Sequence, residues 1–117
     1  MPVPRHEAKA ELFRTLGHPV RIRVLELLCE REYAVHELLA TMDVEPSTLS
    51  QQLGILRRAG IVRQQRRGGE VRYSLMVPSI GELLGAARTT LGVLLADRAQ
   101  LQADLDEEDT TVGSARS

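Results

Sequence analysis

The fold of this chain is most constrained by residues 45–75, where a helical pattern leads directly into two short extended segments. Leu49, Leu53 and Leu56 recur at helical spacing, which places them on one face of a helix. Pro46 suits the first helical position, and the pattern continues to about Ala59. The other face carries short polar side chains, so one side of this helix is suited to a core and the other to a binding partner.

A basic hairpin is predicted to follow this helix. Gly60 supplies the C-terminal stop, and residues 61–65 form the first strand. Gly68 and Gly69 provide the positive φ angles of a tight turn, and residues 70–76 form the second strand. In the second strand we expect Val71, Tyr73 and Leu75 to point inward and Arg72 and Ser74 to point outward.

Other helical patterns lie before and after this segment. Apolar residues recur with helical spacing in residues 6–16, in the segment opened by Pro19, and in residues 35–42, and a last long helix starts at Pro78. Residues 43–45 form a short turn between the third helix and the polar-faced one. Two helices joined by a short turn and followed by a basic hairpin predict a winged helix-turn-helix, in a chain that is mainly α with a small β-hairpin (α+β).

The 117-residue length predicts one domain at residues 6–106, a mobile arm at 1–5 and a disordered acidic tail at 107–117. The net charge of −1 conceals an uneven distribution. Residues 46–76 contain six arginines and one glutamate, a local charge of +5, whereas residues 97–117 contain six acidic residues and two arginines, a local charge of −4. A near-neutral protein with one basic face still attracts a polyanion, because the local field governs the encounter.

Several functional classes are disfavoured. A single cysteine, Cys29, allows no internal disulfide and fits the reducing cytoplasm; it is expected on a buried stripe as a small core residue rather than as a reactive thiol. We expect no membrane span and no signal peptide. An enzyme is not expected, because Cys29 has no placed histidine and Gly68 and Gly69 lack the lysine and helix of a phosphate loop.

Double-stranded DNA is the partner that this pattern favours, although a charged face can also be merely solvated. Base readout is assigned to the short or amide side chains at the start of the polar-faced helix: Ser47, Thr48, Ser50, Gln51 and Gln52. Phosphate contacts are assigned to Arg57, Arg58, Arg66, Arg67 and Arg72. Tyr73 has two interpretations, a hydroxyl donor to phosphate or a packing residue between wing and core.

The chain resembles the ArsR/SmtB family of winged-helix repressors over about residues 8–105. The resemblance lies in the motifs Leu16-Gly17-His18-Pro19-Val20-Arg21-Ile22, Tyr33-x-Val35-x-Glu37-Leu38, Ser50-x-Gln52-Leu53-x-x-Leu56-x-x-Ala59-Gly60-Ile61-Val62 and Arg67-Gly68-x-x-Val71-x-Tyr73-x-Leu75. It implies a homodimer that represses a promoter at a pseudo-palindromic operator and is released by an inducer, often a metal ion. The family often has histidines where Gln51 and Gln52 stand, which changes the expected sequence preference.

The terminal helices are expected to form the homodimer. An apolar seam runs along the last helix, and so long a helix cannot be covered by a domain of this size. The predicted dimer residues are Leu12, Leu84, Ala87, Leu91, Leu94 and Leu101. The alternative is that the last helix folds back onto its own core.

No sensor site of the resembled family is present intact. Its thiolate sites have cysteines where Ala34 and His36 stand, its other common site needs histidine on the last helix, and a persulfide sensor needs two cysteines. The remaining candidates are His6, His36 and Glu37, which would suit nickel, zinc or cobalt, with His18 assigned to the helix entry. The alternatives are a winged-helix protein that responds to a protein partner or small molecule without a metal site, and a dimeric scaffold that binds protein.

Overall fold

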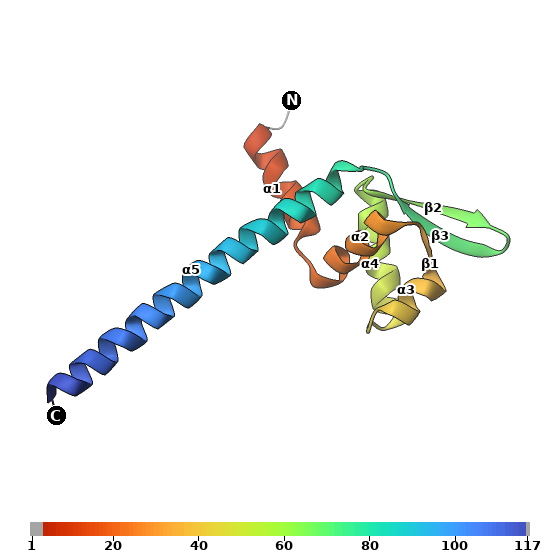
Figure 1. Cartoon of the computed structure of the whole chain (residues 1–117). Helices are drawn as coiled ribbons and strands as arrows, with labels where there is room; N and C mark the ends of the chain where they lie inside the picture. Colours follow the sequence, from red (N-terminus) through yellow and green to blue (C-terminus); the bar gives the residue numbers. More distant parts are fainter. Residues whose placement is uncertain (1–3, 117) are drawn as a thin grey trace. The chain divides into compact units, whose positions relative to one another are not determined.

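The computed structural model describes residues 4–116, with side chains described through residue 107. The chain divides into two compact units, residues 1–81 and 82–117, and each is described by itself. The elements in chain order (Figure 1) are α1 (Arg5–Leu16), α2 (Pro19–Glu30), β1 (Tyr33–Ala34), α3 (Val35–Thr41), α4 (Pro46–Arg58), β2 (Val62–Arg67), β3 (Glu70–Leu75) and α5 (Ser79–Arg116).

The first unit has the predicted winged helix-turn-helix fold. Helix α2 packs against α4 and β3, and α3 lies against β1 and β3. Leucine side chains dominate the core because aromatic residues make up only 3% of the chain. The most deeply buried side chains are Val24, Leu25, Leu38, Leu49, Leu53 and Leu56. The predicted stripe Leu49, Leu53 and Leu56 is therefore confirmed as the inner face of α4.

The sheet has three strands in the order β1-β3-β2, all antiparallel. The sequence pattern predicted the hairpin but not β1, which pairs Tyr33 with Tyr73 and Ala34 with Arg72. A strand of two residues is too short to show the alternation by which strands are recognised. Its pairing makes β3 the central strand and joins the start of α3 to the wing.

The predicted Gly-Gly turn is confirmed. Gly68 and Gly69 have φ angles of 59° and 80°, and Arg67 pairs with Glu70 across them. Two successive positive φ angles match a two-residue turn whose twist suits the flanking strands. The strand β2 continues two residues beyond the expected end at residue 65, so Arg66 and Arg67 belong to the strand rather than to the turn.

Three details near the N-terminus refine the expectations. Helix α1 begins at Arg5, one residue before the predicted start, and residues 1–3 of the expected arm lie outside the described residues. His18 caps α2 as expected for a helix-entry residue, because its Nδ1 accepts a hydrogen bond from the Val20 N–H at 3.1 Å. The prediction for Cys29 was wrong: the residue is exposed near the end of α2, outside the buried stripe of Val24, Leu25, Leu27 and Leu28.

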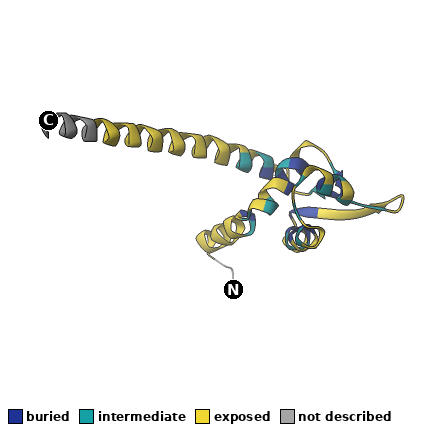
Figure 2. Ribbon diagram, turned by 90° about the horizontal axis from the view of Figure 1, so that it is seen from below, coloured by how far each residue is buried: buried dark blue, intermediate teal, exposed yellow. Residues whose placement is uncertain are grey.

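The second unit consists of α5. Its backbone is helical as far as Arg116, which differs from the disordered tail expected at residues 107–117. Hydrogen bonds from Gln100 to Asp104 and from Gln102 to Asp106 support the helix before that point. Most of its described side chains are exposed (Figure 2). By length and composition alone, residues 79–107 of α5 are long and apolar enough to cross a membrane, whereas no membrane-spanning segment was expected from the sequence.

Candidate nucleic-acid interface

The start of α4 presents a short, polar and exposed surface. Ser47, Ser50 and Gln51 are exposed, and Thr48 is half-buried. Pro46 occupies the first turn, and Glu45 makes no side-chain cap, so the first N–H groups of α4 are not bonded by that side chain. Four of the five predicted base-reading residues therefore have side chains that are at least partly exposed to solvent.

Gln52, the fifth, requires a correction. Only 8% of its surface is exposed, and its Oε1 is buried without a hydrogen-bond partner among the described residues. The reason is helical spacing, because residue 52 follows Leu49 by three positions and precedes Leu56 by four, which places it beside the apolar face. The residue therefore borders the core and is not part of the exposed polar face.

The wing presents exposed arginines. Beyond Val62, every residue of β2 is exposed, including Arg63, Arg66 and Arg67. Arg63 donates from Nε to Ser74 Oγ at 3.2 Å, and Arg67 bonds Gln65 and Glu32 at 3.3 and 3.1 Å. Within the described part of the chain, Arg66 makes no ion pair. Arg66 is thus the wing cation that is most available to an external anion.

Gln64 connects the wing to α4. Its Oε1 accepts hydrogen bonds from Arg57 Nη1 at 2.8 Å and from the Tyr73 hydroxyl at 3.3 Å. Tyr73 is only 7% exposed, so the packing interpretation of this residue matches the structure better than a phosphate contact does. Arg57 remains exposed, as does Arg58, whose guanidinium lies over Gly54.

Arg72 was predicted to contact phosphate, but the structure places it among carboxylates. Its guanidinium bonds Glu32 and Glu70 at 2.9 Å each and lies 3.5 Å from Glu37, with 22% of the side chain exposed. The hydrogen bond with Glu32 is the largest cause that raises the pKa of Arg72. The charge of Arg72 is therefore matched by acids within the chain.

The three candidate metal ligands are not brought together in one chain. His36 Nε2 lies 2.8 Å from Glu70 Oε1, and Glu37 Oε1 accepts the Ala34 N–H at 2.8 Å. That backbone hydrogen bond is the largest cause that lowers the pKa of Glu37. His6 lies on α1, and residues 4–107 contain no group of three His, Cys, Asp or Glu side chains arranged to hold a metal ion.

Two acidic residues at this site, Glu32 and Glu70, were not predicted. Glu70 starts β3, and the hydrogen bonds from His36 and then from Arg72 are the main causes that lower its pKa. A pattern of single charged residues around a tight turn is ordinary for solvent-exposed positions. The sequence signal for Glu70 is that it is the single acid within the arginine-rich residues 46–76, where an acid can pair with a neighbouring arginine.

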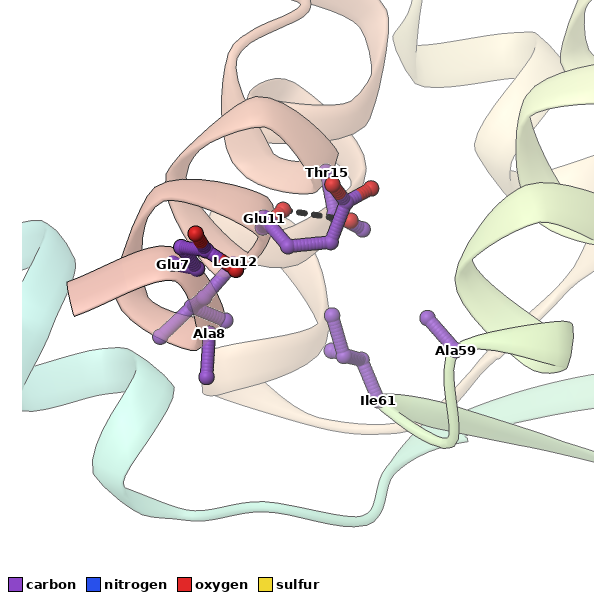
Figure 3. Close-up of a pocket in the computed structure, with 7 residues that line it drawn as sticks. All are labelled: Glu7, Ala8, Glu11, Leu12, Thr15, Ala59 and Ile61. Carbon is purple, nitrogen blue, oxygen red and sulfur yellow. Dashed lines mark hydrogen bonds between the residues drawn. The ribbon is translucent and has the colours of Figure 1, made fainter. Parts of the chain in front are cut away.

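A shallow hollow of ≈ 610 Å³ lies between α1 and the junction of α4 with β2 (Figure 3). Leu12, a predicted dimer residue, lines it together with Ala8 and Ile61. Leu12 is 38% exposed, and Thr15 Oγ1 donates to the Glu11 carbonyl at 3.0 Å.

The predicted dimer residues on α5 are also accessible in the single chain: Leu91, Leu94 and Leu101 are more than half exposed, Ala87 is exposed, and Leu84 is half-buried.

Known proteins match both the sequence and the fold. Residues 18–64 match the family model described as bacterial regulatory protein, arsR family. The HTH-type transcriptional regulator Rv0081 of Mycobacterium tuberculosis is 52% identical over 103 residues, covering 87% of this chain and 90% of that protein. The biofilm growth-associated repressor of Agrobacterium fabrum is 39% identical over 90 residues, covering 74% and 77% of the two chains.

Two solved structures confirm the architecture. The crystal structure of Rv0081 superimposes with a TM-score of 0.75 and covers 84% of this chain and 99% of that chain, at 52% identity. The transcriptional repressor BigR from Xylella fastidiosa gives a TM-score of 0.69 at 38% identity, covering 74% and 88%. The chain therefore belongs to the ArsR family of bacterial regulatory proteins, which are DNA-binding transcriptional regulators and not enzymes.

Proposed function

We propose that this regulator is a homodimeric repressor that binds a pseudo-palindromic operator and is released by an inducer. Base readout is assigned to Ser47, Thr48, Ser50 and Gln51, at the exposed start of α4. Phosphate contacts are assigned to Arg57, Arg58, Arg66 and Arg67. Because such regulators act on the genome, the proposed location is the cytoplasm.

The observation that carries this proposal is the adjacency of two unlike surfaces. The polar start of α4 has side chains that hydrogen-bond base edges, and the exposed arginines of β2 follow it in the same compact unit. Amide and hydroxyl groups discriminate bases in the major groove, whereas arginines on a wing bind the phosphates beside it. Gln64 hydrogen-bonds Arg57 of α4, which supports the wing and the helix acting together.

Homodimerisation is supported by the apolar surface of α5. Leu91, Leu94 and Leu101 are 56%, 52% and 60% exposed in the single chain, at spacings typical of a helix–helix seam. A row of exposed leucines along one helix is stabilised when it is buried against another apolar surface. A symmetric dimer would present two α4 helices to two half-sites roughly 34–36 Å apart, one turn of DNA.

The inducer has two candidates. The first is a transition metal such as nickel, zinc or cobalt, bound by His6, His36 and Glu37 across the dimer. The second is a small molecule or protein partner with no metal site. The second is favoured because, within residues 4–107 of one chain, no three His, Cys, Asp or Glu side chains are grouped to hold a metal ion. The contact of His36 Nε2 with Glu70 leaves Nδ1 open and is compatible with either candidate.

The proposal is tested by selecting duplexes from a random pool with the purified protein and then measuring affinity by fluorescence anisotropy. We expect a selected pseudo-palindrome, and loss of discrimination at defined base pairs in Gln51→Ala but not in Gln52→Ala, the matched buried control. Adding Ni²⁺, Zn²⁺ and Co²⁺ in turn separates the inducer candidates. Failure to enrich any duplex at low salt would contradict the proposed function and favour a protein-binding scaffold.

A further inference from the structure

Arg72 is the centre of a charge cluster that joins three elements. Its carboxylate partners come from the residue before β1 (Glu32), from the first turn of α3 (Glu37) and from the first residue of β3 (Glu70). Arg72 itself lies in β3 and pairs with Ala34 of β1 in the sheet. One guanidinium thus links the wing to the helix that precedes α4.

The acidic partners are held by further contacts. Glu37 accepts the Ala34 N–H at 2.8 Å and pairs with Arg31 at 3.2 Å, and the Arg31 guanidinium carbon lies 3.7 Å from the centroid of the Tyr33 ring. Glu32 also pairs with Arg67 at 3.1 Å. Each carboxylate is therefore fixed by a group other than Arg72, so the guanidinium meets an arranged set of acceptors.

The formal charges within the cluster balance. Three arginines (Arg31, Arg67 and Arg72) face three glutamates (Glu32, Glu37 and Glu70), and His36 adds a contact to Glu70. Arg72 attracts a phosphate weakly, since its side chain is 22% exposed and the phosphate would have to replace three carboxylates that already neutralise it. Arg67 differs, because among the described residues it pairs with Glu32 alone and 60% of its side chain is exposed. The planar guanidinium is suited to several carboxylates at once, whereas an ammonium group is a single point charge.

We propose that Arg72 is a positioning residue, which anchors the wing to α3 through Glu32, Glu37 and Glu70 and makes no contact with DNA. This inference rests on the proposed DNA-binding role of the wing. Anchoring of the wing sets where Arg66 and Arg67 lie relative to α4. A binding site weakens when the residues that hold its binding side chains in place are displaced. Arg72 therefore acts on affinity through geometry, while Arg66 acts through charge.

The test compares Arg72→Lys with Arg66→Lys as the matched control, using the full chain. Both variants keep the charge and remove the guanidinium fork. We expect Arg66→Lys to bind the selected duplex like wild type, because lysine serves as a phosphate contact. We expect Arg72→Lys to bind about tenfold more weakly, because an ammonium group cannot bridge the three carboxylates. Its salt slope is expected to stay unchanged, because the charge is kept. Arg72→Lys binding like wild type would overturn the proposal.

Hydrogen exchange of the free protein provides a readout that does not depend on DNA. Amides of β2 and β3 are expected to exchange faster in Arg72→Lys than in wild type and Arg66→Lys, because the hairpin loses its anchor. Unchanged exchange would overturn the positioning role even if wild type bound no duplex. Absence of binding by wild type would instead contradict the proposed function and leave the exchange result to decide the role of Arg72.

A second pair of variants keeps Arg72 and removes an acceptor. Glu70→Gln and the control Glu30→Gln make the same change in charge, but Glu30 belongs to none of the cluster's ion pairs. If Arg72 positions the wing, Glu70→Gln exchanges faster in the hairpin and binds duplex more weakly than Glu30→Gln. If Arg72 contacts phosphate, freeing it would make Glu70→Gln bind more tightly with a steeper salt slope, which would overturn the proposal.

Discussion

The Nε2 atom of His36 lies 2.8 Å from Oε1 of Glu70, a contact that joins the first turn of α3 to the first residue of β3 across 34 positions of sequence. The hydrogen bond from His36 is the largest cause that lowers the pKa of the Glu70 carboxyl, followed by the one from Arg72. The pair lies at the edge of the wing, so the ionisation of one glutamate is linked to the stability of that region.

The first prediction concerns acid stability. Because the pKa of Glu70 is lower in the folded protein, its contribution to stability is present above the unfolded pKa and is lost as pH falls through the lower, folded pKa. We therefore expect the free energy of unfolding of Glu70→Gln to fall less steeply with acid than that of wild type. Urea titrations between neutral and acidic pH measure this. Parallel pH profiles for Glu70→Gln and wild type would contradict the link, and Glu30→Gln is the charge-matched control.

The second prediction concerns the core of α4. Leu56 is fully buried, so Leu56→Ala is expected to lower the free energy of unfolding by about 2–5 kcal/mol through lost burial and a residual cavity. Met76 is 50% exposed, and Met76→Ala is expected to change stability by less than about 0.5 kcal/mol. Urea denaturation followed by circular dichroism measures both. Equal effects of the two substitutions would contradict the assignment of Leu56 to the core.

The third prediction concerns the wing turn. Gly69 has a φ of 80°, a region that costs a residue with a Cβ roughly 1–2 kcal/mol. Gly69→Ala is expected to loosen the hairpin and weaken duplex binding, whereas Gly69→Asn should retain most of both, because asparagine tolerates this conformation. Hydrogen exchange in β2 and β3 and anisotropy titrations measure the two effects. Equal effects of Gly69→Ala and Gly69→Asn would contradict the prediction that the positive φ at residue 69 limits hairpin stability and duplex binding.

The fourth prediction concerns the oligomeric state. Leu91→Glu/Leu94→Glu is expected to convert the proposed dimer into a monomer, because the pair would place charges within the apolar seam. Ala96→Glu/Ala103→Glu adds the same charge on the opposite side of α5 by helical spacing and should leave the dimer intact. Sedimentation equilibrium distinguishes the two. A wild-type protein that is monomeric at micromolar concentration would contradict the proposed homodimer.

Much of this fold follows from short-range sequence patterns. The leucine spacing predicted α4, and two consecutive glycines predicted the turn, because both depend on residues near one another in sequence. Alternation predicted that Arg72 points outward, yet β3 is the central strand and acids more than thirty residues away surround this side chain. Gln52 was grouped with Gln51 by type, although helical geometry places the two on different sides.

We propose that exposed residues of α4 read the bases while exposed arginines of the wing bind phosphates. The deciding measurement is the ratio of affinities for the selected duplex and a scrambled duplex, taken across salt concentrations for Gln51→Ala and for Arg66→Ala/Arg67→Ala. We predict that Gln51→Ala lowers the ratio with an unchanged salt slope, and that the double arginine variant weakens both duplexes and lowers the slope by roughly 1.8. A wild-type ratio of one, or an unchanged salt slope in the double variant, would contradict it.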